Sequence, residues 1–343
     1  MTRDLTRESN VLASLNAGLR AAMADDGRVI VLGEDVLDPY GGAFKVTRGL
    51  SSQFPDRVLA TPISEAAIVA VAIGLALRGH LPVAEIMFGD FLFLAGDQIV
   101  NHAAKYRAMF NDKVRVPLVI RTPMGGRRGY GPTHSQSLEK HFLGVPGLWV
   151  VAPNPLVDPG RLLRQAIFEV EDPVLFVENK IGYGDPVLRD VPGYDMVRLT
   201  DAPSPFPTVW LKPPAPPDGL LLCYGGMTRL ALDAAKTLRE REHLSLGLVV
   251  VSQLAPTPAS HLDAILQETG AAAVVTVEEA PPEGGWGGEM IATIEQIREA
   301  RRLPAFTYRR VGAKNAAIPS ARQLEDGMLP QAGDIVAAVL DCF

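Results

Sequence analysis

Short apolar segments alternate with longer helical segments along the first half of the chain. The segments that we expect to be strands are 28–33, 82–87, 116–122, 148–152 and 174–178. The segments that we expect to be helices are 10–25, 64–78, 91–109 and 158–170. Parallel strands need crossover helices, so this alternation predicts a doubly wound α/β domain whose parallel sheet is covered on both faces.

A proline-rich segment between residues 183 and 217 interrupts this pattern. Because proline lacks an N–H donor and disfavours both helices and central strands, we interpret residues 191–214 as an extended linker. A second alternation follows, with strands expected at 220–224, 246–252, 272–277 and 305–311 and helices at 228–239, 258–269, 288–299, 320–326 and 333–339. The sequence therefore predicts two doubly wound domains, residues 1–190 and 215–343, joined by the linker.

Composition and charge exclude several classes of function. The net charge of −6 provides no basic excess for binding nucleic acid. Cys223 and Cys342 are the only cysteines and form neither a disulfide framework nor a zinc knuckle. Residues 1–8 are charged and lack the apolar core of a signal peptide, and the longest apolar run, 66–77, is shorter than the roughly 20 residues that span a bilayer. We therefore expect a soluble cytoplasmic protein.

The common nucleotide-binding loops are absent from the sequence. Neither G-x-x-x-x-G-K-[ST] nor a G-x-G-x-x-G following a strand occurs, and there is no G-x-S-x-G turn for a serine nucleophile. An α/β protein of this size either binds its ligand in another way or shares the ligand with a partner.

Glu65 and His134 are the two candidate catalytic residues. Glu65 begins an apolar helix, where a carboxylate can complement the helix dipole or, if water is scarce, exchange a proton with a ligand nitrogen. His134 lies in a glycine-rich segment that follows an expected central strand, at the sheet edge where ligands bind. The same pattern is consistent with an exposed loop histidine.

Two further segments are each consistent with two structural interpretations. Phe91 and Phe93 follow the second expected strand, and they form either part of the core or a flat wall for a planar heterocycle. The segment 278–289, which contains Glu278, Glu279 and several glycines, is either a loop at a domain interface or an anion site. We favour the interface.

Taken together, these segments resemble the E1 β subunits of 2-oxo acid dehydrogenase complexes, a transketolase-like family that includes pyruvate, branched-chain 2-oxo acid and acetoin enzymes. The resemblance is nearly continuous from residue 15 to 180 and weaker from 222 to the C-terminus. The matching motifs are GEDV at 33–36, GGAFKVTRGL at 41–50, TPISEA at 61–66, DQI at 97–99 and THSQS at 133–137.

The resemblance implies a thiamine-diphosphate enzyme that decarboxylates a 2-oxo acid oxidatively and transfers the acyl group to the lipoyl group of an E2 acyltransferase. It assigns Glu65 to hydrogen-bond N1′ of the thiamine pyrimidine, Phe91 to pack against that ring and Met87 to a neighbouring apolar contact. It places His134 at the substrate or at the lipoyl group.

The resemblance also implies a partner, because the family carries its diphosphate and Mg²⁺ site, a Gly-Asp-Gly motif, on a separate α subunit. No Gly-Asp-Gly triplet occurs here. The implied assembly is an α2β2 heterotetramer, with a K⁺ ion near Ala166 and Ile167. Two alternatives remain: the C-terminal half of another split transketolase-like enzyme, and a catalytically silent scaffold subunit, although a silent relative is expected to lose Glu65 or His134.

Overall fold

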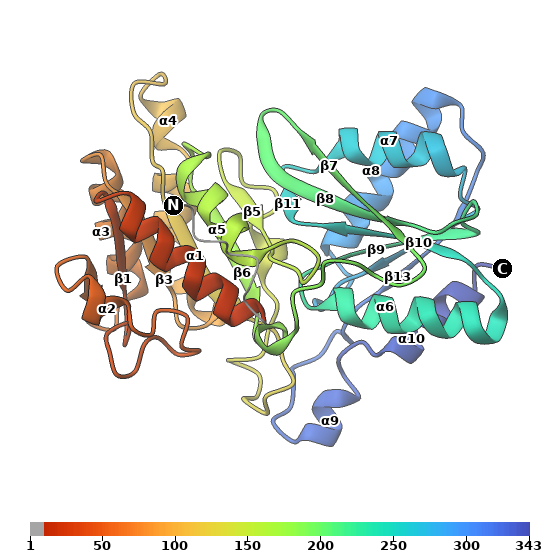
Figure 1. Ribbon diagram of the computed structural model, residues 1–343, viewed down its shortest axis with the longest axis horizontal. Coiled ribbons are helices and arrows are strands. Elements are labelled where there is room, and N and C mark those ends of the chain that lie inside the picture. Colours follow the sequence, from red (N-terminus) through yellow and green to blue (C-terminus); the bar gives the residue numbers. More distant parts are fainter. Residues whose placement is uncertain (1–9) are drawn as a thin grey trace.

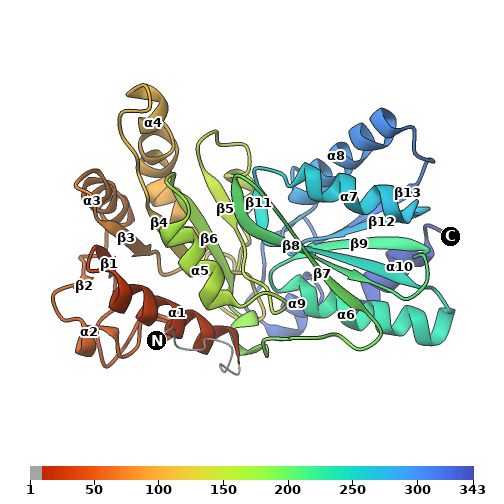
Figure 2. The ribbon, with the colours of Figure 1, turned by 45° about the horizontal axis from the view of Figure 1, so that its top comes forward.

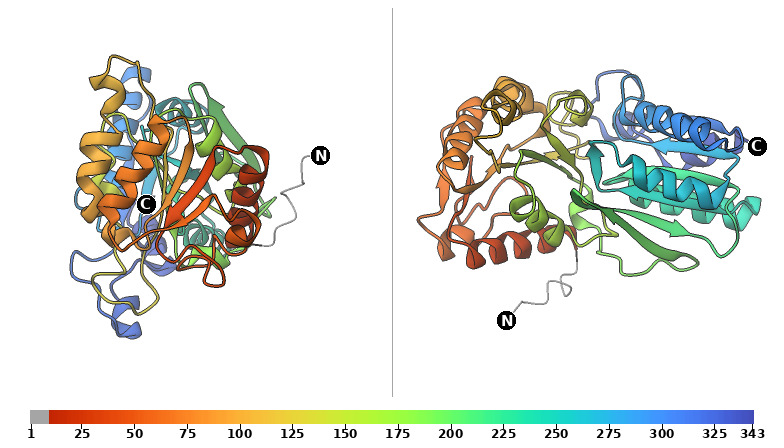
Figure 3. Two further views of the ribbon diagram at one scale, coloured as in Figure 1. Left: turned by 90° about the vertical axis from the view of Figure 1, so that its left-hand side faces the viewer. Right: turned by 90° about the horizontal axis from the view of Figure 1, so that it is seen from above.

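A computed structural model describes residues 10–343, and the charged segment 1–8 lies outside this part of the chain. The chain forms two lobes side by side, each built around its own β-sheet (Figures 1 and 3). The prediction of two α/β domains is confirmed. Both sheets are mixed, however, because antiparallel strands join the parallel ones at one edge of each.

The sheet of the first lobe has seven strands within the described residues, in the order β11-β5-β6-β4-β3-β1-β2. All neighbours are parallel except β11 and β5. The strands are β1 (Val29–Gly33), β2 (Val58–Ala60), β3 (Leu81–Glu85), β4 (Val119–Met124), β5 (Trp149–Val151), β6 (Val174–Asn179) and β11 (Gln253–Ala255).

Helices cover both faces of this sheet. On one face, α1 (Val11–Asp25) packs closely against α5 (Pro159–Phe168), and a Cβ at Gly18 would lie only 2.5 Å from the Cα of Gly160. On the other face lies α3 (Glu65–Leu77). A short helix, α2 (Leu50–Gln53), follows β1.

The single helix expected over residues 91–109 is broken into three pieces. A 3₁₀ turn at Gly89–Ala95 leads into a π-helical turn at Gln98–Ala103 and then into α4 (Tyr106–Met109). Gly96 separates the first two pieces, and a glycine in a helix interior is destabilising. The first piece carries Phe91 and packs against α3.

The sheet of the second lobe has the strand order β13-β12-β9-β10-β8-β7. Its strands are β7 (Asp195–Asp201), β8 (Ser204–Lys212), β9 (Gly219–Tyr224), β10 (Leu246–Val251), β12 (Ala273–Val277) and β13 (Thr307–Val311). Helices α6 (Met227–Thr237) and α10 (Ala332–Leu340) cover one face, and α7 (Ala259–Thr269) and α8 (Trp286–Arg301) cover the other (Figure 2). A short helix, α9 (Arg322–Asp326), lies beside the first lobe.

The linker prediction for residues 191–214 was wrong, because most of this segment is an antiparallel hairpin of the second sheet. β7 pairs with β8, and β8 also pairs with β10. The prolines avoid the conflict with the sheet: Pro203, Pro205 and Pro207 precede Thr208, where the pairing with β10 begins. Edge positions and strand ends tolerate proline in this way.

One strand crosses between the lobes. β11 follows β10 of the second sheet but pairs antiparallel with β5 of the first. The backbone N–H of Ala152 also donates to the carbonyl of Ser252. The predicted second domain, 215–343, therefore contributes residues to the first sheet.

No helix within residues 10–343 is both long and apolar enough to cross a bilayer. The two cysteines are not joined to each other.

Candidate active site

The candidate site lies at the carboxyl edge of the first sheet. Four neighbouring parallel strands, β4, β3, β1 and β2, end there, and the chain continues from them into Gly125, Ile86, Glu34 and Thr61. Open α/β sheets bind their ligands at this edge. The motifs containing Glu65, Met87, Phe91 and His134 all follow these strand ends.

A pair of glutamates occupies the β1–β2 side of this edge. Glu65 is the first residue of α3 and is buried, and Glu34, directly after β1, is buried as well. Burial raises the pKa of Glu34, and the negative charges of Glu65 and Asp35 raise it further. The carboxyl group of Glu65 is therefore close enough to affect the protonation of Glu34.

Two buried oxygen atoms on this side of the edge have no hydrogen-bond partner among the described residues. They are Oε1 of Glu34 and Oγ1 of Thr61. The N–H of Thr61 donates to the carbonyl of Gly33, so both atoms lie at the ends of the paired strands β1 and β2. Buried polar groups are normally hydrogen-bonded, so two unpaired atoms at one edge fit a polar ligand.

His134 lies in an aromatic group on the β3–β4 side of the edge. The centroid of its ring is 4.9 Å from that of Phe88 and 5.2 Å from that of Phe91, both in edge-to-face geometry. Oγ1 of Thr133 is 3.0 Å from its Nδ1 atom. His134 is half-buried, so part of the residue remains in contact with solvent.

The segment 125–136, which we call the His134 loop, has an unusual backbone. Gly125, Gly129 and Gly131 have φ angles of 93°, 70° and 77°, which favour glycine, and Arg127 has a φ of 67°. The N–H of Gly125 donates to the carbonyl of Gln136 and closes the base of the loop. The side chain of Gln136 donates to Asp90 over 2.7 Å and ties the loop to the 3₁₀ turn that carries Phe91.

Lys180 lies beneath the same loop. Its side chain is fully buried, and its ammonium group donates to the carbonyl of His134 and lies over the rings of Phe88 and Tyr130, 5.1 and 5.6 Å from their centroids. Burial lowers the pKa of Lys180 to about 8. Lys180 directly follows β6 and lies outside the motifs that contain Glu65 and His134.

A buried ionic network supports the site from within the sheet. Arg121 of β4 donates to both oxygens of Glu178 and to Glu85, each over 2.7 Å. The hydroxyl of Tyr183 donates to Glu178 over 2.5 Å. A Cβ on Gly42, in the loop after β1, would lie 2.5 Å from Oε1 of Glu85, so this loop packs directly against the network. The network thus connects three adjacent strands at their carboxyl ends.

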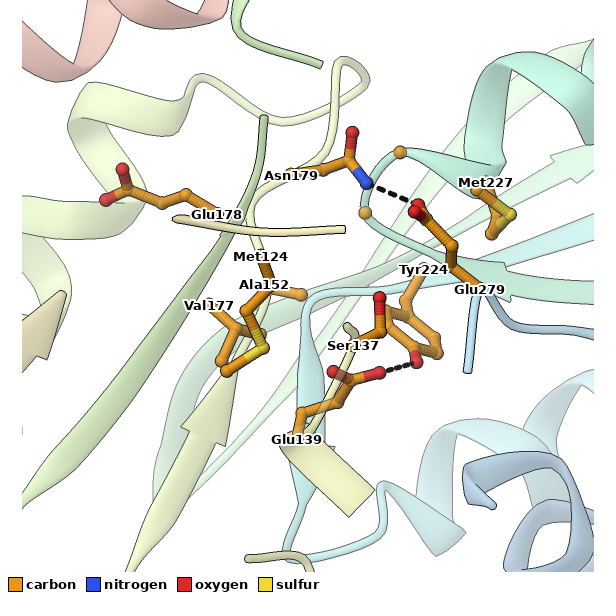
Figure 4. A pocket seen from close by; sticks show the side chains of 12 residues that line it. Met124, Ser137, Glu139, Ala152, Val177, Glu178, Asn179, Tyr224, Met227 and Glu279 are labelled. Atoms are coloured by element: carbon orange, nitrogen blue, oxygen red, sulfur yellow. Dashed lines mark hydrogen bonds between the residues drawn. The ribbon is translucent and has the colours of Figure 1, made fainter. Parts of the chain in front are cut away.

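Glu279 confirms the interpretation of segment 278–289 as a domain interface. Its carboxylate accepts the N–H of Gly126 over 2.6 Å and the amide of Asn179 over 2.7 Å, both from the first lobe. A cavity of about 30 Å³ lies beside it, and its lining includes Glu139, which is hydrogen-bonded to Tyr224 (Figure 4). Burial raises the pKa of the neighbouring Glu278 to about 7.

The structure places the other predicted residues as follows. Met87 is half-buried two residues beyond β3, in the same segment as Phe88. Phe93 is 56% exposed and contacts His141, so it does not line the group around His134. Ala166 and Ile167 are buried near the end of α5, in the core shared with α1. Residues 10–343 contain no group of three or more His, Cys, Asp or Glu side chains able to hold a metal ion.

Comparisons with known proteins agree with this architecture. Residues 8–185 match the family model "Transketolase, pyrimidine binding domain", and residues 212–335 match "Transketolase, C-terminal domain". A solved structure described as a split gene transketolase, an inactive β4 tetramer, has a TM-score of 0.71 and 23% identity and covers 96% of both chains. The fold is therefore that of a transketolase-type protein with separate pyrimidine-binding and C-terminal domains.

Relatives at higher identity narrow the family. The chain is 37% identical over 294 residues to 3-methyl-2-oxobutanoate dehydrogenase subunit beta of Mycobacterium tuberculosis, which covers 85% of this chain and 81% of the relative. It is 36% identical to pyruvate dehydrogenase E1 component subunit beta of Leifsonia xyli, over 96% and 93% of the two chains. It is 34% identical to acetoin:2,6-dichlorophenolindophenol oxidoreductase subunit beta of Cupriavidus necator, over 97% of each. The chain belongs to the family of E1 β subunits of 2-oxo acid dehydrogenases.

Proposed function

We propose that this chain is the β subunit of a thiamine-diphosphate-dependent 2-oxo acid dehydrogenase. In the proposed reaction a 2-oxo acid is decarboxylated oxidatively, and the acyl group passes to the lipoyl group of an E2 acyltransferase. The buried pair Glu34 and Glu65 carries this proposal, because a carboxylate pair with an unpaired oxygen fits a planar heterocycle with ring nitrogens. Bound thiamine diphosphate supplies the carbon nucleophile that decarboxylation requires.

Residues of this chain would position the cofactor and the substrate. Glu65 would hydrogen-bond N1′ of the bound pyrimidine, and Glu34, whose pKa is raised by burial, would serve as a nearby proton reservoir. Phe91 and Met87 provide apolar contacts to the ring. His134, half-buried beside Phe91, would hydrogen-bond the substrate or the lipoyl group.

The exposed face of α3 supports a partner subunit next to this site. The helix is apolar all round, yet Ala67, Ala70, Val71, Gly74 and Leu77 are exposed on the side away from the core. Ile63, just before the helix, is 85% exposed. Apolar faces of this kind mark association surfaces, and small side chains allow close packing. We assign this face to the α subunit of an α2β2 assembly, which would hold the diphosphate and Mg²⁺.

We also propose that a K⁺ ion binds near Ala166 and Ile167. Both residues lie in the last turn of α5, where helix carbonyls lack intrahelical N–H partners and can coordinate a cation.

The test is titration calorimetry of thiamine diphosphate with Mg²⁺ into this chain alone and into the chain coexpressed with an α subunit. We expect tight binding only in the coexpressed sample. Tight binding to the chain alone would contradict a shared site. In the assembled enzyme, Glu65→Gln should keep the fold and greatly slow exchange of the C2 proton of the bound cofactor, measured by NMR. Unchanged turnover in this variant would favour a scaffold role.

His134→Ala separates the two halves of the reaction. We expect a larger loss of acyl transfer to a lipoyl domain than of decarboxylation with an artificial electron acceptor. Equal losses would argue against a role of His134 in transfer, and ketol transfer between sugar phosphates in place of both reactions would favour the split-transketolase alternative.

A further inference from the structure

The second lobe holds the backbone of the His134 loop through a buried carboxylate. Glu325 of α9 accepts the N–H of Arg127 over 2.7 Å with one oxygen and the N–H of Gly129 over 3.0 Å with the other. Its side chain is fully buried, although α9 is a short helix at the outer edge of the second lobe, beside this loop (Figure 1). Both oxygens of Glu325 are therefore used on a single segment of the other domain.

The loop follows the surface of α9 and the residues after it. A Cβ on Gly126 would lie 2.5 Å from Leu329 and 3.0 Å from Glu325, so the loop backbone touches this surface without space between them. The guanidinium of Arg127 reaches the carbonyl of Pro330. Arg127 itself has a φ of 67°, a conformation unfavourable for arginine that persists only when the surroundings fix it.

The contact is linked to His134 through a short piece of backbone. Gly129 is five residues from His134, and the N–H of His134 donates to the carbonyl of Gly131. On the side of the first lobe, the loop is held by the contact of Lys180 with the carbonyl of His134 and by the bond between Gly125 and Gln136. Release of Glu325 would leave the N–H groups of Arg127 and Gly129, at the tip of the loop, without their carboxylate acceptor.

We propose that Glu325 is a positioning residue for His134. The C-terminal domain, through this carboxylate, fixes the loop that presents the histidine to its reaction partner. The effect on acyl transfer rests on the proposed function, whereas the effect on the loop itself does not.

Hydrogen exchange of the segment 125–136, followed by mass spectrometry in the assembled enzyme, tests the contact directly. Glu325→Ala should speed amide exchange in this segment by about 10- to 100-fold, because hydrogen bonds to a charged acceptor are among the stronger ones. Trypsin should also cleave faster after Arg127 and Arg128. Gln323→Ala is the matched control, since this side chain lies in the same helix but is exposed. It should leave both readouts unchanged.

Two variants protect the test against simple misfolding. Glu325→Gln keeps the size but places an amide NH2 against a loop N–H, so it should release the loop to an intermediate extent. Gly126→Ala perturbs the same contact from the first lobe, because its Cβ would collide with Leu329. Folded Glu325→Ala and Gly126→Ala proteins with the exchange rate of the wild type would overturn the proposal.

The catalytic readout distinguishes this proposal from the proposed function. In Glu325→Ala, kcat/KM for the lipoyl domain should fall at least tenfold more than the rate with an artificial acceptor, in line with the exchange effect. Equal losses in the two assays would overturn positioning through His134. Faster exchange in a protein that turns over no 2-oxo acid, with or without the substitution, would support the contact and contradict the proposed function.

Discussion

Replacing Arg121 by methionine should strongly destabilise the first domain. The guanidinium is 1% exposed and neutralises Glu85 and Glu178, each at 2.7 Å. Without it, two carboxyl groups remain buried with no opposing charge. Removal of one partner from a buried ion pair costs about 3–5 kcal/mol. For a domain of this size each kcal/mol lowers Tm by roughly 2–4 °C, so the expected loss is about 6–20 °C.

The loss should depend on pH. Burial already raises the pKa of Glu85, and Arg121 opposes that rise. In the variant this carboxyl should bind a proton more tightly when folded than when unfolded. Stability of the variant relative to the wild type should therefore decrease as the pH rises through the folded pKa of Glu85 in the wild type, which already lies above the ordinary 4.5.

Thermal unfolding followed by circular dichroism at pH 5 and pH 8 measures both effects. The triple variant Arg121→Met, Glu85→Gln, Glu178→Gln is the informative companion, because it leaves no unpaired buried charge. It should recover a large part of the lost Tm. A Tm for Arg121→Met within 2 °C of the wild type, or a triple variant no more stable than the single one, would refute this account of the network.

Three further outcomes are expected. Glu34→Gln should stabilise the chain above about pH 5 and lose that advantage towards pH 4, because the raised pKa of Glu34 makes its charged form unfavourable in the folded protein. Urea unfolding across this pH range measures the stability difference between variant and wild type. A difference that does not change with pH would contradict the prediction. The stability of the wild type relative to Lys180→Met should grow by up to about 3 kcal/mol between pH 8 and 10.5, because the folded pKa of Lys180, about 8, lies below the ordinary 10.5. A stability difference that stays constant over this pH range would show that the ammonium group is not desolvated. Val71→Glu on the exposed face of α3 should prevent copurification with the α subunit without lowering Tm. The control Leu340→Glu, on α10, should still copurify with the α subunit. Equal recovery of the α subunit with both variants would place the partner elsewhere.

The positions of the main sheet strands could be predicted because buried parallel strands consist of continuous apolar residues, as in 174–179. The meeting of Phe91 and His134 was also predictable, since both follow ends of neighbouring parallel strands. Glu34 carried the same signal, directly after β1, but its unpaired oxygen became visible only in the structure.

The hairpin β7–β8 could not be read from local sequence. Its prolines oppose strand formation at the level of single residues, and only their position before the ladder with β10 removes the conflict. Glu325 is separated from its loop partners by nearly 200 residues and sits in a short helix with exposed neighbours. No periodicity distinguishes such a glutamate from one that faces solvent.

The pairing of β11 with β5 has a consequence for how the protein is made. During synthesis β5 leaves the ribosome about 100 residues before β11. The backbone hydrogen-bonding groups on one side of Trp149–Val151 therefore stay unpaired while the hairpin and the first part of the second sheet emerge. An uncovered strand side is a template for pairing with another chain. A truncated product that ends before residue 253 would keep this exposed side permanently, and should therefore aggregate during expression even if its own helices and strands are intact.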